Sequence, residues 1–218
     1  MMSKAYEYPN TKELLKAFAK DLPTVSHWFN NRIDSPEEIV ETAVGKETYR
    51  GLHYFDPGPK VVFTSWALNE IGTNSLRQAA NLPDQAAYDK WLTEFTGRLR
   101  HYWRGSQNPP RGIEYGQGRK LTNLLMKKYV LWTDLGTLER GRLTKYLHVA
   151  LDEYVLLGIR TCILEFPAHA VRIPTKPSMG AVTDEKMYRR IQAGLREIAR
   201  QAEAPTIYLD VFFWNLSH

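Results

Sequence analysis

The sequence predicts an all-α fold. In several long segments apolar residues recur at helical spacing, and many of these segments open at a residue type that caps helices. The alternation of apolar and polar residues that is typical of half-buried strands is scarce. The chain has 218 residues, 43% of them hydrophobic and 12% aromatic, so it can bury a substantial core.

The first half of the chain contains several predicted helices and one loop. Residues 10–22 form the first helix, and its inner face carries Leu14, Leu15, Phe18 and Leu22. Residues 35–38, Ser-Pro-Glu-Glu, form a capping box with proline at the first helical position, so a helix should run from there through Val44. Residues 51–59 are rich in Gly, Pro and Asp and predict a loop. Residues 61–71 fit a strand or a helix, and the helical trend favours a helix.

A long helix is expected to start at Pro83-Asp84 and to end near Trp103. Its inner face carries five bulky apolar residues, Tyr88, Trp91, Leu92, Phe95 and Leu99. Residues 108–112, Asn-Pro-Pro-Arg-Gly, end that region. A glycine-containing turn at residues 112–118 then leads into the helix of Lys120.

Three more helices are expected toward the C-terminus. Asp152 should cap a helix that reaches about Leu164, and a proline-interrupted loop follows at residues 167–180. Thr183-Asp184 starts a helix whose apolar residues recur at helical spacing, and a final helix follows Pro205.

Charge is distributed unevenly along the chain. The net charge is +5, but residues 98–145 hold eleven Lys or Arg and only three acids, a local charge of +8 that leaves −3 elsewhere. A basic block of this kind favours a polyanionic partner, and the alternative is a set of solvated helix faces. No apolar run approaches the roughly 20 residues of a membrane span, and the first residues lack the apolar core of a signal peptide. We therefore expect a cytoplasmic protein whose single Cys162 is a buried structural thiol.

Lys120 and Asp152 are the candidate catalytic pair. Lys120 follows Gly116-Gln117-Gly118-Arg119 and is expected in the first turn of its helix, where the helix dipole disfavours an added positive charge. An amine attacks as a nucleophile only when it is unprotonated, so such surroundings suit it. Asp152 would cap a second helix with an ionised, rigidly held carboxylate, and the ordinary alternative is a cap and nothing more.

Two further groups of residues could accompany this pair. Lys120, Leu124, Lys127 and Leu131 lie on one helical stripe that could line a pocket with two amines; alternatively, both lysines are solvated and only the apolar Leu121, Leu125 and Trp132 face inward. Near the C-terminus, Asp210 and Trp214 are four residues apart and so share a helix face. Together they could bind the edge of a base and stack on its ring, or the helix could simply pack into the core.

The order and flanking residues of these three groups resemble the helix-hairpin-helix DNA glycosylases, and within them the archaeal GO-glycosylase branch of the 8-oxoguanine glycosylases. The resemblance covers about 100 residues, from Gly116 to Trp214. It implies a single domain over residues 1–218, built of two helical lobes with the active site between them. It also implies a monomer that acts in the cytoplasm, at the nucleoid, on double-stranded DNA containing a modified base, in DNA repair or antiviral defence.

The resemblance also implies roles for individual residues. Lys120 would attack C1′ and form a Schiff base, with possible elimination of the 3′ phosphate, while Asp152 would stabilise the positive charge that develops on the sugar. The remaining roles are base binding, by Asp210, Trp214, Leu124 and Lys127, and DNA-backbone binding, by Gly116, Gly118, Arg119 and Arg142. No cofactor or metal is expected, because one cysteine cannot hold the four-cysteine iron–sulfur cluster that some members carry.

Three departures from the family pattern leave the substrate base open. The hairpin of residues 112–118 is looser than the usual Leu-Pro-Gly-Val-Gly, Leu124 stands where the archaeal branch often has an aromatic residue, and Glu153 stands where it often has proline. In the family, the last two positions belong to the part of the site that binds the extruded base. We therefore expect either 8-oxoguanine or a bulkier modified base, such as one in phage DNA. The alternative function is a non-catalytic DNA-binding module on the same scaffold.

Overall fold

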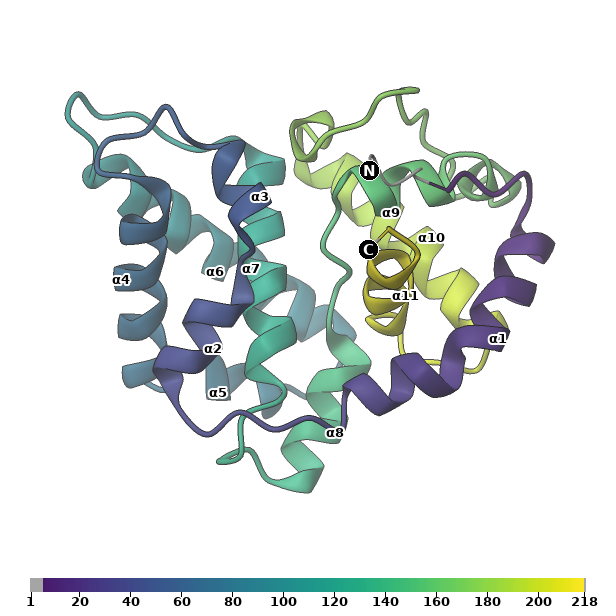
Figure 1. The fold of residues 1–218 in the computed structure, drawn as a ribbon, viewed down its shortest axis with the longest axis horizontal. Helices are drawn as coiled ribbons and strands as arrows, with labels where there is room; N and C mark the ends of the chain where they lie inside the picture. Colours follow the sequence, from purple (N-terminus) through teal and green to yellow (C-terminus); the bar gives the residue numbers. More distant parts are fainter. Residues whose placement is uncertain (1–5, 218) are drawn as a thin grey trace. The chain divides into compact units, whose positions relative to one another are not determined.

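The computed structural model describes residues 6–217 and confirms the all-α class. Within this range there are eleven α-helices and two short 3-10 helices, and no β-strand forms beyond an isolated bridge between Ile33 and Trp132 (Figure 1). None of the helices in the same range is both long and apolar enough to cross a membrane.

The chain divides into two compact units. Unit 1 comprises residues 6–31, 115–120 and 147–217 of the described chain, and unit 2 comprises residues 32–114 and 121–146. Helix α7 (Tyr115–Tyr129) contributes its first residues to unit 1 and the remainder to unit 2. Lys120 and Asp152 therefore both belong to unit 1.

Unit 1 is built around its C-terminal helix. The helices of this unit, besides the start of α7, are α1 (Thr11–Trp28), α9 (Glu153–Ile159), η1 (Cys162–Glu165), η2 (Met179–Ala181), α10 (Glu185–Gln201) and α11 (Tyr208–Ser217). Helix α11 packs against α1, α9 and α10 (Figure 1). The ring of Phe212 lies 5.3 Å from that of Phe18 on α1. On the α9 side, Gly158 makes room for Phe213, because a Cβ at Gly158 would lie 2.2 Å from that ring.

Unit 2 contains the remaining helices, namely α2 (Pro36–Ala43), α3 (Lys46–Arg50), α4 (Pro59–Gly72), α5 (Ser75–Ala80), α6 (Gln85–Gly105), the rest of α7, and α8 (Thr137–Tyr146). Aromatic rings form much of its core. Phe95 of α6 stacks on Trp91 with 4.7 Å between ring centroids and contacts Trp66 of α4 at 4.9 Å. Two ion pairs tie its helices together, Arg98 with Glu70 and Arg77 with Glu139.

Helix starts agree well with the predictions from the sequence. Ser35, Asp84 and Asp184 each cap a helix by accepting a hydrogen bond from the backbone N–H three residues later. Residues 59–72 are helical, as preferred over a strand, and the inner face predicted for α6 is buried. These features rest on local chemistry.

Two predicted helix ends were wrong. Helix α1 continues past Pro23 to Trp28. Proline has no N–H to donate to the carbonyl of Ala19, but Ala19 and Pro23 are both exposed, so water can hydrate that carbonyl. Helix α9 ends at Ile159 and not near Leu164. The chain turns there, and the side chains of the next two residues, Arg160 and Thr161, bind Glu7.

The glycine turn before Lys120 was also predicted wrongly. Gly116 and Gly118 lie inside α7, which begins at Tyr115, and neither has a positive φ. A Cβ on Gly116 would lie 2.0 Å from the Met179 carbonyl oxygen and 2.8 Å from that of Val182. Gly116 is therefore needed because the η2 segment approaches the helix closely. Lys120 consequently stands in the second turn of α7, not the first.

Replacing Glu139 with Gln should destabilise the protein at neutral pH. Arg77 donates two hydrogen bonds to the Glu139 carboxylate, at 2.9 and 3.0 Å, and Gly136 N–H donates a third at 2.9 Å. These bonds lower the pKa of Glu139 from 4.5 to about 2. Because the folded-state pKa is depressed, the stabilisation is fully present above about pH 4.5 and is lost as pH falls toward 2. Arg77 is 41% exposed, so the expected loss at pH 7 is only about 1 kcal/mol.

Urea unfolding of wild type and Glu139→Gln at pH 7 and pH 3 measures this loss, which should shrink at the lower pH. Glu47→Gln is the matched control, because Glu47 pairs with Arg50 on the surface of α3 and both side chains are at least 70% exposed. An equal loss of stability in both variants would show that the Arg77–Glu139 pair stabilises the protein no more than the exposed Arg50–Glu47 pair does.

Candidate active site

Lys120 and Asp152 face each other within unit 1. The Lys120 Nζ atom lies 3.7 Å from the Asp152 Oδ2 atom, and the two side chains are 12% and 20% exposed. The distance exceeds that of a direct hydrogen bond, so the contact is a close ion pair that a small side-chain movement could tighten. Both groups retain some access to solvent. Because only 12% of the Lys120 side chain is exposed, the alternative in which Lys120 is a solvated surface residue is excluded.

The two oxygens of Asp152 have different partners. Oδ1 accepts hydrogen bonds from Tyr154 N–H and Val155 N–H, each at 3.1 Å, and so caps α9 as predicted. Oδ2 faces the Lys120 amine. The cap fixes the orientation of the carboxyl group, and one carboxylate thereby serves both the helix and the contact with Lys120.

The backbone that leads into Asp152 is buried and held by side chains. Residues 147–151 lie outside any helix and are at most 3% exposed. Gln192 accepts from Val149 N–H at 3.1 Å and donates to the Val149 carbonyl at 2.8 Å, and Asp210 Oδ1 accepts from Ala150 N–H at 2.8 Å. None of the roles inferred from the sequence included Gln192.

Residues next to the candidate pair in the sequence form a buried polar cluster in unit 1. Arg119 Nε donates to the Tyr115 hydroxyl at 2.8 Å, and its guanidinium carbon lies 4.6 Å from the ring centroid of Tyr188. The Tyr188 hydroxyl lies 2.8 Å from His148 Nδ1, while Arg196 approaches His148 Nε2 at 3.3 Å. Because arginine can only donate, His148 Nε2 accepts and Nδ1 carries the ring proton.

Arg119 and the two glycines have different surroundings from those that the sequence predicted. Arg119 is only 2% exposed, and its guanidinium contacts Tyr115 and Tyr188 within the protein. Gly116 and Gly118 are also buried, inside α7. All three were expected to contact the DNA backbone because a loose glycine turn would present amides and a cation to it. In the structure all three residues are packed in the interior of the protein.

Asp210 and Trp214 have different surroundings on α11. Asp210 is 6% exposed, with Oδ1 bound to Ala150, whereas Trp214 is 47% exposed. The neighbours Phe212 and Phe213 are buried. Nearly half of the Trp214 side chain is therefore accessible to solvent, unlike its two neighbours.

The remaining predicted residues belong to unit 2. Leu124 is partly exposed on α7, and Lys127, at 8% exposed, is buried rather than solvated. Burial and the charge of Lys127 lower the pKa of the next residue, Lys128. Arg142 lies exposed on α8.

Much of the basic block at residues 98–145 serves the fold. Arg98 pairs with Glu70, and Arg140 donates to the carbonyls of Val130, Trp132 and Leu135. Arg119 is buried as well, so several cations of this block make contacts within the fold. Exposed members of the block include Arg104, Arg111, Arg142 and Lys145.

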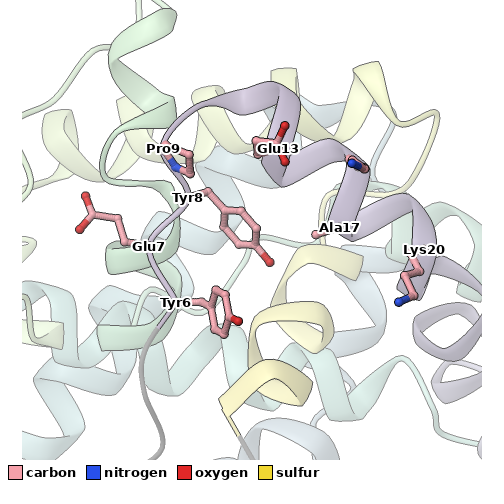
Figure 2. Close-up of a pocket in the computed structure, with 8 residues that line it drawn as sticks. Tyr6, Glu7, Tyr8, Pro9, Glu13, Ala17 and Lys20 are labelled. Atoms are coloured by element: carbon pink, nitrogen blue, oxygen red, sulfur yellow. The ribbon is translucent and has the colours of Figure 1, made fainter.

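Unit 1 also has a pocket of about 390 Å³ beside the start of α1. The residues that line it are Tyr6, Glu7, Tyr8, Pro9, Glu13, Lys16, Ala17 and Lys20 (Figure 2). Its two acids and two lysines balance in charge, and the hydrogen bond from Arg160 holds the pKa of Glu7 below its ordinary value. Burial raises the pKa of Tyr8 to about 12. The lining includes none of the residues predicted to act in catalysis.

Other reactive chemistry finds no support in the described residues. Cys162 is buried as predicted, and burial raises the pKa of its thiol to about 11, so the thiol stays protonated at neutral pH. Within residues 6–217 no group of three or more His, Cys, Asp or Glu side chains is arranged to hold a metal ion.

In comparisons with known proteins, no family model, curated protein or solved structure matches the chain.

Proposed function

We propose that the protein is a DNA glycosylase that extrudes a modified base from double-stranded DNA and cleaves its N-glycosidic bond through Lys120 and Asp152. The observation that carries the proposal is the 3.7 Å contact between Lys120 Nζ and Asp152 Oδ2, made by two largely shielded side chains. A lysine close to a rigid carboxylate suits nucleophilic attack at a sugar carbon. The similar spacing in helix-hairpin-helix glycosylases supports the same reading.

The proposed reaction uses only these two side chains, the substrate and water. The lone pair of Lys120 Nζ forms a bond to C1′ as the bond from C1′ to the base breaks. The base leaves with the electron pair of the broken bond and takes up a proton from water. Asp152 Oδ2 is placed to accept the proton that the amine must lose, and its charge stabilises the cationic sugar. The nitrogen lone pair then forms a C=N bond as the C1′–O4′ bond breaks, and O4′ takes up the proton that Asp152 accepted, which leaves a Schiff base between Lys120 and C1′. Extrusion of the nucleotide, which exposes C1′, costs a few kcal/mol of stacking.

Borohydride trapping on a panel of duplexes tests the proposal. The panel carries 8-oxoguanine, pyrimidines with bulky 5-substituents, or unmodified bases, and base release is measured in parallel. Borohydride reduces the Schiff base to a stable amine, so at least one modified duplex should become covalently attached to the protein. DNA binding without an adduct or base release on any duplex would indicate the non-catalytic DNA-binding module instead.

Replacing Trp214 with Ala should weaken binding to DNA that contains the released base by about ten- to a hundredfold. Stacking of a base on an aromatic ring contributes roughly 1–3 kcal/mol, and the ring of Trp214 on α11 is 47% exposed. Fluorescence anisotropy with modified and unmodified duplexes measures the effect. Leu216→Ala is the control, because Leu216 is a partly exposed apolar residue of the same helix. Equal weakening by both variants would remove Trp214 from the base-binding site.

DNA affinity should fall steeply with salt, and Arg142→Glu should make that dependence shallower. Each phosphate neutralised contributes about −0.9 to the log–log slope on duplex DNA. Arg142 is an exposed residue of the basic block, so it is available to a phosphate. Lys12→Glu reverses an exposed charge outside the block and should leave the slope closer to that of wild type. Identical slopes for Arg142→Glu and wild type would show that Arg142 contacts no phosphate.

A further inference from the structure

Two buried polar side chains hold the backbone immediately before Asp152. Gln192, on α10, has an exposed fraction of 0% and binds both the N–H and the carbonyl of Val149. Asp210, on α11, binds the N–H of Ala150. Since residues 147–151 lie in no helix or sheet, these side chains supply hydrogen bonds that regular structure would otherwise provide.

The hydrogen bonds specify one position for the segment. Its backbone is buried, and a buried N–H or carbonyl that loses its partner costs free energy, so sliding the chain by a residue is unfavourable. Helices α10 and α11 pack against each other, which gives both side chains a firm support. Asp152 follows Ala150 by only two residues, and so the position of its carboxyl group depends on these bonds.

We propose that Asp210 and Gln192 are positioning residues, which hold the chain so that Asp152 Oδ2 faces Lys120. This inference rests on the proposed glycosylase function. It gives Asp210 a role through the backbone of Ala150, in place of the contact with the base edge that the family resemblance implied. A displacement of about 1 Å at a reacting group can reduce a rate about a hundredfold, so positioning of this kind has a measurable effect.

Replacement of Asp210 by Asn separates the two roles. The amide oxygen of Asn can still accept the Ala150 hydrogen bond, whereas Ala cannot. If Asp210 acts by positioning, Asp210→Asn stays within a few-fold of wild type and Asp210→Ala loses about a hundredfold in rate. Both variants should keep the wild-type ratio of rates between one modified base and another.

The experiment is single-turnover base release from duplexes with 8-oxoguanine and with a bulky 5-substituted pyrimidine, over a range of protein concentrations. The rate at saturation should fall in Asp210→Ala while the half-saturating concentration stays unchanged. Gln192→Met, which keeps the side-chain length but removes both bonds to Val149, should behave in the same way. A site-resolved hydrogen-exchange measurement follows the Ala150 amide, which should be protected in wild type and Asp210→Asn and exposed in Asp210→Ala.

Several results would overturn the inference. An Asp210→Asn variant as slow as Asp210→Ala, or a change in base preference in either, would mean that the Asp210 charge acts on the substrate. Rapid exchange of the Ala150 amide in wild type would also overturn the inference, because Asp210 would then not hold that amide. This measurement remains decisive even if Asp210→Ala does not fold. If wild type released no base at all, the proposed function itself would fail. Normal release by wild type with full activity in Asp210→Ala and Gln192→Met would remove only the positioning role.

Discussion

Replacing Lys120 with Gln should abolish both base release and borohydride trapping. Gln has a similar length but no amine, so neither the bond to C1′ nor the Schiff base can form. Lys120 is 12% exposed and its cation contacts Asp152 at 3.7 Å without a direct hydrogen bond, so the fold should tolerate the neutral replacement. We expect the melting temperature and the affinity for modified DNA to stay close to those of wild type.

Lys127→Gln is the matched control for this experiment. Lys127 is a buried lysine on the same helix, seven residues after Lys120, and it lies in unit 2 rather than beside Asp152 in unit 1. Its loss should leave trapping intact, even if base affinity decreases. Undiminished base release by Lys120→Gln would contradict the mechanism and would move attention to Lys127 and its neighbour Lys128, whose pKa is lowered by burial.

Helix starts could be predicted from the sequence because their chemistry is local. A cap such as Ser35 or Asp152 binds backbone groups two or three residues away, and nothing distant has to be known. The all-α class followed from periodicity for the same reason. The placement of Lys120 near Asp152 could not be derived locally, since 31 residues separate them; there the family resemblance supplied the prediction.

The failures share a non-local cause. Gly116 allows the approach of carbonyls from residues 179 and 182, and no local signal distinguishes this role from that of a turn glycine. Arg119 is buried between Tyr115 and Tyr188, the second of which comes from α10. From the sequence alone, an arginine next to two glycines is predicted to be solvent-exposed, because the distant residues that bury it are not known.

One residue carried a signal that could have been used. Gln192 lies four residues after Tyr188 and three before Leu195, so it falls on the apolar stripe of α10. A polar side chain at such a position must find a partner inside the protein. That partner is the backbone of Val149, three residues before Asp152. The position of Gln192 on the apolar face of α10 thus predicted a buried polar contact, but it did not identify Val149 as the partner.

Replacing Asp152 with Asn should reduce base release by about a hundred- to a thousandfold while changing stability little. Asn caps helices about as well as Asp, and its amide oxygen can accept the bonds that Oδ1 receives from Tyr154 and Val155. The side chain loses the negative charge that faces Lys120, and with it both the stabilisation of the cationic sugar and the acceptor for the amine proton. Single-turnover base release and thermal unfolding, measured on the same samples, separate the two effects.

Asp184→Asn is the matched control, because Asp184 caps α10 in the same unit by accepting from Met187 N–H at 2.9 Å and is exposed. Both substitutions should cost similar, small amounts of stability, and only Asp152→Asn should slow the reaction. Asp152→Ala would remove the cap as well and should cost about 1 kcal/mol of stability. If the activity of the three variants instead followed their melting temperatures, Asp152 would be a helix cap without a catalytic role. The contrast between an intact cap and a lost charge therefore decides whether the Oδ2 atom that faces Lys120 takes part in the reaction.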